Sequence, residues 1–323
     1  MPETETPAEP LITPTPQPSP TPTLPPLGTE GNPITIGFVL TTEDPARTQA
    51  AQDIAFLISR DTGYAIESLL YPDFQTMATE ILDGEVDLFW LAPFEYLYLN
   101  WEGAAQVVLM TNHQGVYAYG VQFLTNINSG FTSYFDSETN QSTDEAITAL
   151  QQFSGTRPCF LNPHSIPGNY VPLGLLNNVS TPTRAPVYAY TYNAILRALY
   201  IKGICDFGVS YALTGDPLTS GDILQNLPDA QEQIEVIWQS TGIIPNTNLS
   251  TSPSLPTHIL FRIQEAVLRL PDMPEGLSTL STALNYEVEA LRTVEDTFYN
   301  SLRSLIIPLA LDLEMITSQP AIQ

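Results

Sequence analysis

The chain alternates short apolar segments with helical segments, and this alternation is the feature that most restricts its fold. Residues 33–40, 64–71 and 86–91 are short, largely apolar runs typical of buried strands. The segments between them, 46–63 and 74–83, have helical periodicity and end at glycines. Strand–helix–strand connections of this kind require right-handed crossovers and parallel neighbouring strands. The sequence therefore predicts an α/β fold with helices on both faces of a mainly parallel sheet.

The same pattern recurs in the second half of the chain. Strands are predicted at 157–161, 187–190 and 205–211, with helices at 168–177 and 191–202 between them. Two similar halves in tandem favour a two-lobed architecture over one long sheet. Helical periodicity returns at 275–306, which predicts that two helices close the chain.

Proline is concentrated at the N-terminus, where 10 of the 29 prolines lie within residues 1–32. The Pro/Thr alternation there favours an extended, solvated spacer, so residues 1–32 are predicted to be a disordered tether. No signal peptide precedes it, and we interpret the chain as an extracytoplasmic, membrane-anchored bacterial lipoprotein whose export signal and anchor are missing from this sequence. The alternative is a plain disordered tail without an anchoring role.

The charge is strongly negative, with 35 acidic against 10 basic residues and a formal net charge of −25. Four of the acids lie in residues 1–32, so the remainder still carries −21. This balance excludes nucleic acid and anionic membrane surfaces as partners, because both require clustered Lys and Arg. No run of about 18 apolar residues is present, so contact with a membrane is expected only through the missing anchor.

The chemistry-bearing residues do not form an enzyme motif. His164 and Ser165 are adjacent, but nearby Asn162 cannot orient an imidazole as an acid would, and nothing in the sequence places Asp206 beside them. No phosphate-binding, dinucleotide-binding or zinc-protease motif occurs, and two cysteines cannot form a tetrahedral zinc site. We therefore expect no catalytic residues, no metal and no cofactor.

Four segments appear in an order that resembles a known family. They are 34–38, 84–96, 160–168 and 202–208, the last followed by 236–240 and 244–245. Together they resemble the phosphonate/phosphite-type solute-binding proteins, a branch of the type II periplasmic binding proteins that serve ABC transporters. The resemblance spans about residues 33–306.

The resemblance implies a monomer of two lobes that close by a hinge around a small molecule and deliver it to an ABC permease. Lobe 1 would comprise 33–120 with about 241–270 returning to it, lobe 2 would comprise 121–240, and 271–323 would form C-terminal helices packed on lobe 1. The ligand would bind at the carboxyl ends of the strands, where hydroxyls and free N–H groups at a helix start hold an oxyanion.

The sequence departs from the family where that anion would bind. Ser165-Ile166-Pro167 stands in place of the family's Ser-Thr-Ser, so two hydroxyls and one backbone N–H are lost. Phe74 and Leu91 each stand where the family has a Tyr, Tyr190 stands in place of a His, and an acid near residue 213 is missing. Burying a phosphonate against such residues would leave its charge unpaired, at a cost of several kcal/mol. We therefore expect the family fold with a different solute.

The predicted lining of the site is aromatic, with the carboxylates of Glu43, Asp44 and Asp73 near the strand ends. Aromatic faces beside carboxylates suit a partly aromatic solute that is neutral or cationic. Three alternatives stay open: phosphonate or phosphate-ester binding as in the family, a ligand-sensing domain of a signalling system, and a structural or adhesive surface protein. The predicted ligand-binding residues are Thr41, Thr42, Phe74, Trp90, Leu91, Phe94, Tyr96, His164, Ser165, Ile166, Tyr190, Ser210 and Tyr211, with Tyr170 as a further aromatic candidate.

The two cysteines lie in predicted strands of the second lobe. Cys159 is in the first of these strands and Cys205 in the third, and the two strands are neighbours in this fold. A disulfide between them and a pair of buried thiols are both compatible with that position.

Overall fold

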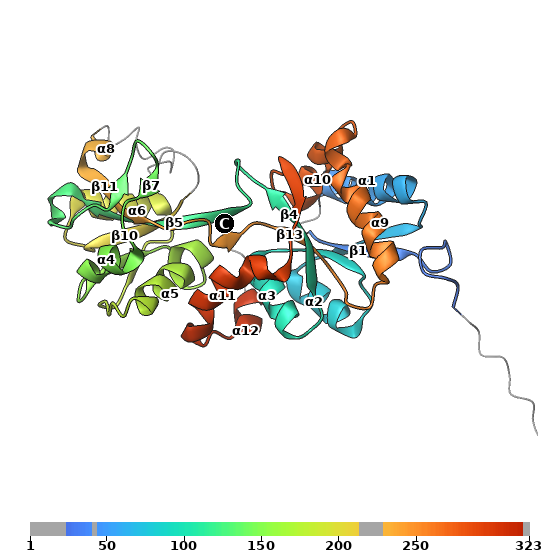
Figure 1. Cartoon of the computed structure of the whole chain (residues 1–323), viewed down its shortest axis with the longest axis horizontal. Helices are drawn as coiled ribbons and strands as arrows, with labels where there is room; N and C mark the ends of the chain where they lie inside the picture. Colours follow the sequence, from blue (N-terminus) through green and yellow to red (C-terminus); the bar gives the residue numbers. More distant parts are fainter. Residues whose placement is uncertain (1–23, 41–43, 213–228, 319–323) are drawn as a thin grey trace, which may run out of the picture.

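A computed structural model describes residues 24–40, 44–212 and 229–318. It has two lobes, each built on one sheet with helices on both faces (Figure 1). The predicted two-lobed α/β fold is confirmed, with one refinement. Each sheet is mixed rather than mainly parallel, because the strands that return from the other lobe pair antiparallel to their neighbours.

The first sheet holds strands from the beginning and from the end of the chain. Its order is β14-β4-β13-β3-β1-β2. The strands are β1 (Ile34–Val39), β2 (Ile66–Tyr71), β3 (Leu88–Leu91), β4 (Gln106–Asn112), β13 (Asn248–Thr251) and β14 (Ala290–Thr293). β1 is parallel to both β2 and β3, so these three strands end at the same edge of the sheet.

Helices cover both faces of this sheet. On one face lie α1 (Pro45–Thr62), α9 (Thr257–Leu268) and α10 (Gly276–Leu284), and on the other lie α2 (Phe74–Asp83) and α3 (Pro93–Trp101). The alternation of side chains along β3 explains the two cores. Leu88 and Trp90 pack toward α1 and α9, whereas Phe89 and Leu91 pack toward α2 and α3.

The second sheet has the order β11-β5-β10-β8-β9. Its strands are β5 (Ala118–Asn126), β8 (Pro158–Phe160), β9 (Val187–Tyr188), β10 (Phe207–Ala212) and β11 (Ile234–Gln239), and the short β12 (Ile244–Pro245) also pairs with β5. α6 (Tyr192–Ile201) covers one face, while α4 (Ala146–Leu150) and α5 (Val171–Asn178) cover the other. A small hairpin of β6 (Phe135–Asp136) and β7 (Gln141–Ser142) and the short α8 (Ala230–Gln233) lie beside β11.

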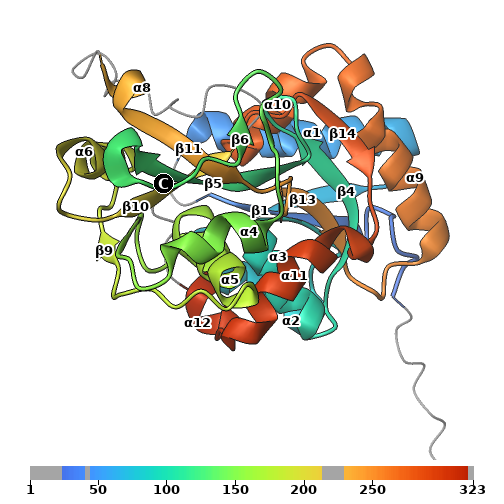
Figure 2. The ribbon, with the colours of Figure 1, turned by 60° about the vertical axis from the view of Figure 1, so that its left-hand side comes forward.

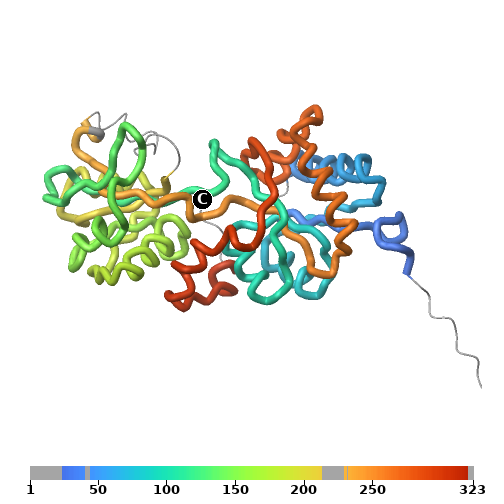
Figure 3. Tube along the Cα trace, in the orientation of Figure 1, coloured from blue at the N-terminus to red at the C-terminus, as the bar shows by residue number. Residues whose placement is uncertain are grey.

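The chain crosses between the lobes at 113–117 and again at 240–247 (Figures 1 and 3). The two crossings are hydrogen-bonded to each other, since the N–H of Asn246 donates to the carbonyl of Tyr117 at 3.1 Å. Gly120 allows this close approach, because a Cβ there would lie 2.7 Å from the carbonyl oxygen of Thr241. The two crossings therefore run side by side between the lobes.

The C-terminal region differs from the two helices predicted for 275–306. α10 ends at Asn285, which adopts a positive φ of 50°, and the chain then enters β14. β14 pairs antiparallel with β4, Ala290 opposite Asn112 and Thr293 opposite Leu109. Two further helices follow, α11 (Asn300–Ile306) and α12 (Leu313–Thr317). The strand forms because β4 offers an unpaired edge, which the helical spacing of Leu291 and Val294 does not reveal.

The described part of the N-terminal segment, 24–32, is a turn attached to the first lobe. The carbonyl of Gly28 accepts a hydrogen bond from the N–H of Ala65 at 2.8 Å, and Leu27 packs against the core beneath α1. The ordered chain therefore begins before Pro33, and the rest of the predicted tether, 1–23, lies outside the described residues.

The alternatives for the two cysteines are resolved. Cys159 of β8 and Cys205, just before β10, form a disulfide with a Cα–Cα distance of 5.6 Å. Both cysteines are buried under α6. Within the described ranges, no helix is long and apolar enough to cross a membrane.

Candidate functional site between the lobes

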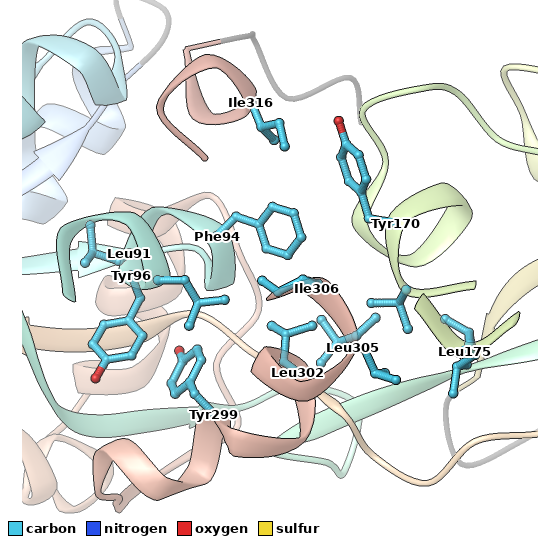
Figure 4. Close-up of a cluster of buried hydrophobic side chains, with 14 of the residues drawn as sticks. Leu91, Phe94, Tyr96, Tyr170, Leu175, Tyr299, Leu302, Leu305, Ile306 and Ile316 are labelled. Carbon is cyan, nitrogen blue, oxygen red and sulfur yellow. The ribbon is translucent and has the colours of Figure 1, made fainter. Parts of the chain in front are cut away.

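Two helix starts meet where the lobes face each other. β3 of the first lobe leads into α3, and β8 of the second leads through a turn at Ile166–Tyr170 into α5. Phe94 in the first turn of α3 and Tyr170 before α5 bring their ring centroids to 5.7 Å (Figure 4). The carboxyl ends of β3 and β8 thus lie at the same boundary, which is where open α/β sheets bind ligands.

The C-terminal helices were predicted to pack on lobe 1, and the structure shows that they also contact lobe 2. α12 packs on α3 of the first lobe, whereas α11 contacts α5 of the second (Figure 2). Figure 4 shows Leu302, Leu305 and Ile306 of α11 between Phe94 and Leu175. The closest approach is at Gly174, where a Cβ would lie 2.7 Å from the carbonyl oxygen of Leu305 and 2.9 Å from its Cβ.

We expect Gly174→Ala to destabilise the protein by up to about 2 kcal/mol. Alanine gains about 1 kcal/mol of helix propensity over glycine, but its methyl group must push α5 and α11 apart, which costs about 1–3 kcal/mol. Urea unfolding measures the difference. Asn177→Ala, on the exposed side of the same helix, is the matched control and leaves stability within about 0.5 kcal/mol of wild type. A more stable Gly174→Ala protein would contradict the close α5–α11 contact.

Tyr96 anchors the C-terminal segment rather than facing the boundary. Its hydroxyl donates to Asp296 at 2.6 Å, and its ring lies 4.2 Å from that of Tyr299. The Tyr299 hydroxyl in turn accepts from Asn248 at 2.8 Å. Arg303 pairs with Asp296 and holds the pKa of that carboxyl below its usual value. Tyr96 is fully buried, and it holds the segment that leads into α11.

Several other predicted ligand-binding residues also lie inside a core. Trp90 faces α1 and α9, on the side of the sheet away from Phe94. Leu91 is fully buried, and Phe74 packs edge-on against Tyr98 with ring centroids 6.3 Å apart. Thr41 and Thr42 lie outside the described residues. Of the first-lobe candidates that are described, Phe94 is therefore the one that the structure places against the other lobe.

The loop after β8 is organised differently from an oxyanion-binding loop. The Ser165 hydroxyl accepts the N–H of Gly168 at 3.0 Å and so caps its own turn. Pro167 has no N–H, and Ile166 packs against the interlobe apolar cluster. His164 lies in the same loop, and its Nδ1 is buried without a hydrogen-bond partner in the described structure.

The remaining second-lobe candidates lie at the ends of β9 and β10. Tyr190 is 62% exposed and adopts a positive φ of 63°, an unusual conformation for an aromatic residue. The Ser210 hydroxyl donates to the carbonyl of Tyr211 at 3.1 Å. The ring of Tyr211 meets that of Tyr192, the first residue of α6, at 5.2 Å. The ends of β9 and β10 therefore carry mainly aromatic side chains and few hydrogen-bond donors.

Tyr192 and Tyr119 were missed by the sequence reasoning. The Tyr192 hydroxyl is buried beside Ser165, and its pKa is raised by burial and by the nearby Tyr119 hydroxyl, while the interaction with Ser165 opposes the rise. Tyr119 is the second residue of β5, next to the crossing between the lobes, and burial raises its pKa as well. The signal that could have identified Tyr192 was Thr191, because threonine is a common helix-capping residue and places Tyr192 in the first turn of α6.

Glu95 was also missed. It is the third residue of α3, and its carboxylate accepts the N–H of Ala92 at 2.7 Å. The side chain as a whole is partly exposed, but its carboxylate is enclosed by protein, and this burial raises its pKa to about 7 although the Ala92 N–H opposes the rise. The signal that could have identified Glu95 was an acid three residues after Ala92, the residue that joins β3 to α3, because this spacing is typical of a helix-capping acid.

Two pockets on the described surface are lined by other residues than the predicted ligand-binding ones. One of about 660 Å³ lies beside the crossing strands and is bounded by Tyr119, Trp238 and Leu305. The other, of about 710 Å³, is an open groove beside Arg292 and Phe298 on the first lobe. Within the described residues, no group of three or more His, Cys, Asp or Glu side chains could hold a metal ion.

Comparison with known proteins identifies the family. Residues 37–297 match the family described as ABC transporter, phosphonate, periplasmic substrate-binding protein. A curated relative, the phosphate-import protein PhnD of Mycolicibacterium smegmatis, is 22% identical over 228 residues. That match covers 66% of this chain and 65% of the relative, so it spans somewhat less than two thirds of the relative's length.

Solved structures show the same fold at low sequence identity. XAC2383 from Xanthomonas citri, solved bound to ATP, has a TM-score of 0.58 at 13% identity, covering 88% of this chain and 97% of that one. PhnD1 from Prochlorococcus marinus, solved with methylphosphonate, has a TM-score of 0.50 at 13% identity, covering 86% and 98%. With the family match over most of its length, the chain belongs to the periplasmic substrate-binding proteins of phosphonate-type ABC transporters.

Proposed function

We propose that this protein captures a small, partly aromatic solute that is neutral or cationic, and passes it to an ABC permease. The solute binds between the lobes, against Phe94 and Tyr170 on one side and the loops that carry His164, Tyr190 and Tyr211 on the other. Closure about the paired crossings at 113–117 and 240–247 encloses it. The protein acts as a monomer outside the cytoplasm, held at the membrane through an N-terminal lipid anchor.

The loop after β8 carries this proposal. An oxyanion needs several donors that converge on one point, and a helix start normally supplies them. Here Pro167 has no N–H, Ile166 is apolar, and the N–H of Gly168 already donates to the Ser165 hydroxyl. A phosphonate at this position would find fewer donors than an oxyanion needs, whereas an aromatic solute would find the rings of Tyr170, Tyr192 and Tyr211 on the same lobe.

A thermal-shift panel tests the proposal. We expect aromatic and cationic solutes to raise the melting temperature, since a ligand at 100 times its Kd adds about 2.7 kcal/mol of stability. Phosphonate, phosphite and phosphate esters are expected to leave it unchanged. Strong stabilisation by phosphonates, with no response to aromatic or cationic solutes, would contradict the proposed solute class and support the family's usual ligand.

A further inference from the structure

We propose that the pocket of about 660 Å³ beside the crossing strands is a second ligand site, and that it binds an uncharged saccharide. The pocket is separate from the interlobe solute site proposed at Phe94 and Tyr170, neither of which lines it. Its volume is within the range of about 300–1,000 Å³ that small-molecule sites occupy. A ligand in this pocket touches parts of both lobes and the crossings that join them.

Three parts of the molecule form the walls of the pocket. The first wall is α11, which contributes Ser301 and Ser304. The second wall belongs to the second lobe and consists of the hairpin at 140–142 and the end of β11. The third wall consists of the chain at the two crossings, within 116–120 and 240–243.

The first two walls are each fixed to a different lobe. Arg303 holds α11 to the first lobe, because it pairs with Asp296 and donates to the side-chain oxygen of Asn100 in α3 at 2.6 Å. Ser142 holds the hairpin to β11, since its hydroxyl accepts the N–H of Gln239 at 2.8 Å and donates to the carbonyl of the same residue at 2.8 Å. A ligand that bridges these walls therefore restricts the motion of one lobe against the other.

α11 separates the pocket from the proposed solute site. Leu305 lines the pocket, whereas the next residue, Ile306, lies near Phe94 in the interlobe apolar cluster (Figure 4). The two sites are therefore on different sides of one helix, and a molecule in the pocket leaves the contact between Phe94 and Tyr170 in place.

The polar part of the lining favours an uncharged ligand. Asp144 is the only charged residue among the described residues that line the pocket, and it is exposed at the rim. The other polar lining residues carry hydroxyls and amides. Among the described residues, the side chains of Gln141, Gln239 and Ser301 have no hydrogen-bond partner, so their donors and acceptors are available to a ligand.

The buried part of the lining is apolar and aromatic. Leu175, Trp238 and Leu305 are buried, and Tyr119 lines the pocket beside them. The indole N–H of Trp238 already donates to the carbonyl of Asp144 at 3.0 Å, so this side chain offers its ring surface rather than a donor. A saccharide has an apolar C–H face and a rim of hydroxyls, which match an aromatic surface surrounded by amides and hydroxyls.

Calorimetric titration with matched sugars tests the site. Glucose, maltose and cellobiose are uncharged probes, while glucuronate and glucosamine resemble glucose but carry a negative and a positive charge. Each is titrated into wild type, Ser304→Phe, which places a ring in the pocket, and Gln239→Ala, which removes an amide without breaking a side-chain hydrogen bond of the described structure.

Ser278→Phe is the matched control for Ser304→Phe. Both serines are exposed helix residues whose hydroxyls donate to the carbonyl three residues earlier, Ser304 to Ser301 at 2.8 Å and Ser278 to Glu275 at 2.9 Å. Ser278 lies in α10, outside the pocket. If Ser304→Phe does not fold, Gln239→Ala still tests the site, because that side chain supports no other described residue.

We expect at least one uncharged sugar to bind wild type at millimolar concentration or below, and more tightly than either charged sugar. Ser304→Phe should weaken that sugar at least about tenfold, because the ring takes up space in the pocket. Gln239→Ala should weaken it about threefold to tenfold through the loss of one hydrogen bond. Ser278→Phe should bind it like wild type.

Hydrogen exchange of the complex locates the bound sugar. Exchange should slow in peptides that cover all three walls, 116–120, 239–243 and 300–306, and should stay unchanged at 164–170. Slower exchange at 164–170 alone would place the sugar at the interlobe site, which would overturn both the second site and the proposed aromatic solute.

The remaining outcomes also decide the question. If no uncharged sugar binds, or if both pocket variants bind it like wild type, the saccharide site is wrong. If glucuronate or glucosamine is the tightest ligand, the uncharged class is wrong. The proposed solute is tested separately by the thermal-shift panel of aromatic and cationic molecules, so a negative result there leaves the second site standing.

Discussion

Removing the disulfide between Cys159 and Cys205 is expected to lower the free energy of unfolding by about 4 kcal/mol. The bridge closes a loop of 46 residues, and the loss of chain entropy in the unfolded state scales with the logarithm of that length. The loop contains the turn at His164, α5, β9 and all of α6, so the second lobe should respond most. Urea unfolding of Cys159→Ala/Cys205→Ala against wild type measures the effect.

Two controls connect this loss to the bridge itself. Reductant should destabilise wild type by a similar amount and leave the double variant unchanged. Alkylation in denaturant should label no cysteine in the untreated protein and both after reduction, because no cysteine is free in the structure. Two labelled cysteines without reductant would show that the protein holds buried thiols instead of a disulfide.

Glu95→Gln is expected to stabilise the ligand-free protein at alkaline pH by as much as about 3 kcal/mol. Burial raises the pKa of Glu95 from 4.5 to about 7, so the folded state holds this proton more tightly than the unfolded state does. The stability that it contributes is complete below pH 4.5 and is lost as the pH rises to 7. Above pH 7 the ionised carboxylate therefore destabilises the fold, and glutamine removes that cost.

The pH profile of the difference is the test. The gain from Glu95→Gln should be near zero at pH 4, grow between pH 4.5 and 7, and level off above that. Glu102→Gln should show no such profile, because that side chain is exposed. If the Glu95→Gln gain were the same at pH 4 and pH 8, the carboxylate would not be buried as described.

The strands and helices of the parallel part of each lobe could be predicted from the sequence. The segments predicted as 64–71 and 74–83 are β2 and α2 within two residues. Local periodicity and caps determine such elements, and Asp73 illustrates this by accepting the N–H of Thr76 at the start of α2. The family resemblance rested on four short segments, each continuous in the sequence, and the family match over residues 37–297 confirms that resemblance.

The candidate site was only partly accessible from the sequence. Alternation along β3 shows that Trp90 and Leu91 point to opposite faces, but not which face meets the other lobe. Tyr96 was predicted to line the site, but it is buried and donates to Asp296, which lies 200 residues away in the sequence. Phe94 could be placed at a strand end, whereas its neighbour Tyr170 comes from another lobe. Contacts over such distances depend on packing rather than on local spacing.

What the sequence determined by itself is the alternation of elements, the negative charge and the presence of a single hydroxyl in Ser165-Ile166-Pro167, because each is a property of composition or of near neighbours. The tertiary structure alone decided three things: the strand β14 on the edge of β4, the contact of α11 with α5, and the burial that raises the pKa of Glu95. All three depend on which surfaces remain unpaired once the sheets have formed. That is a property of the whole fold, which no local pattern contains.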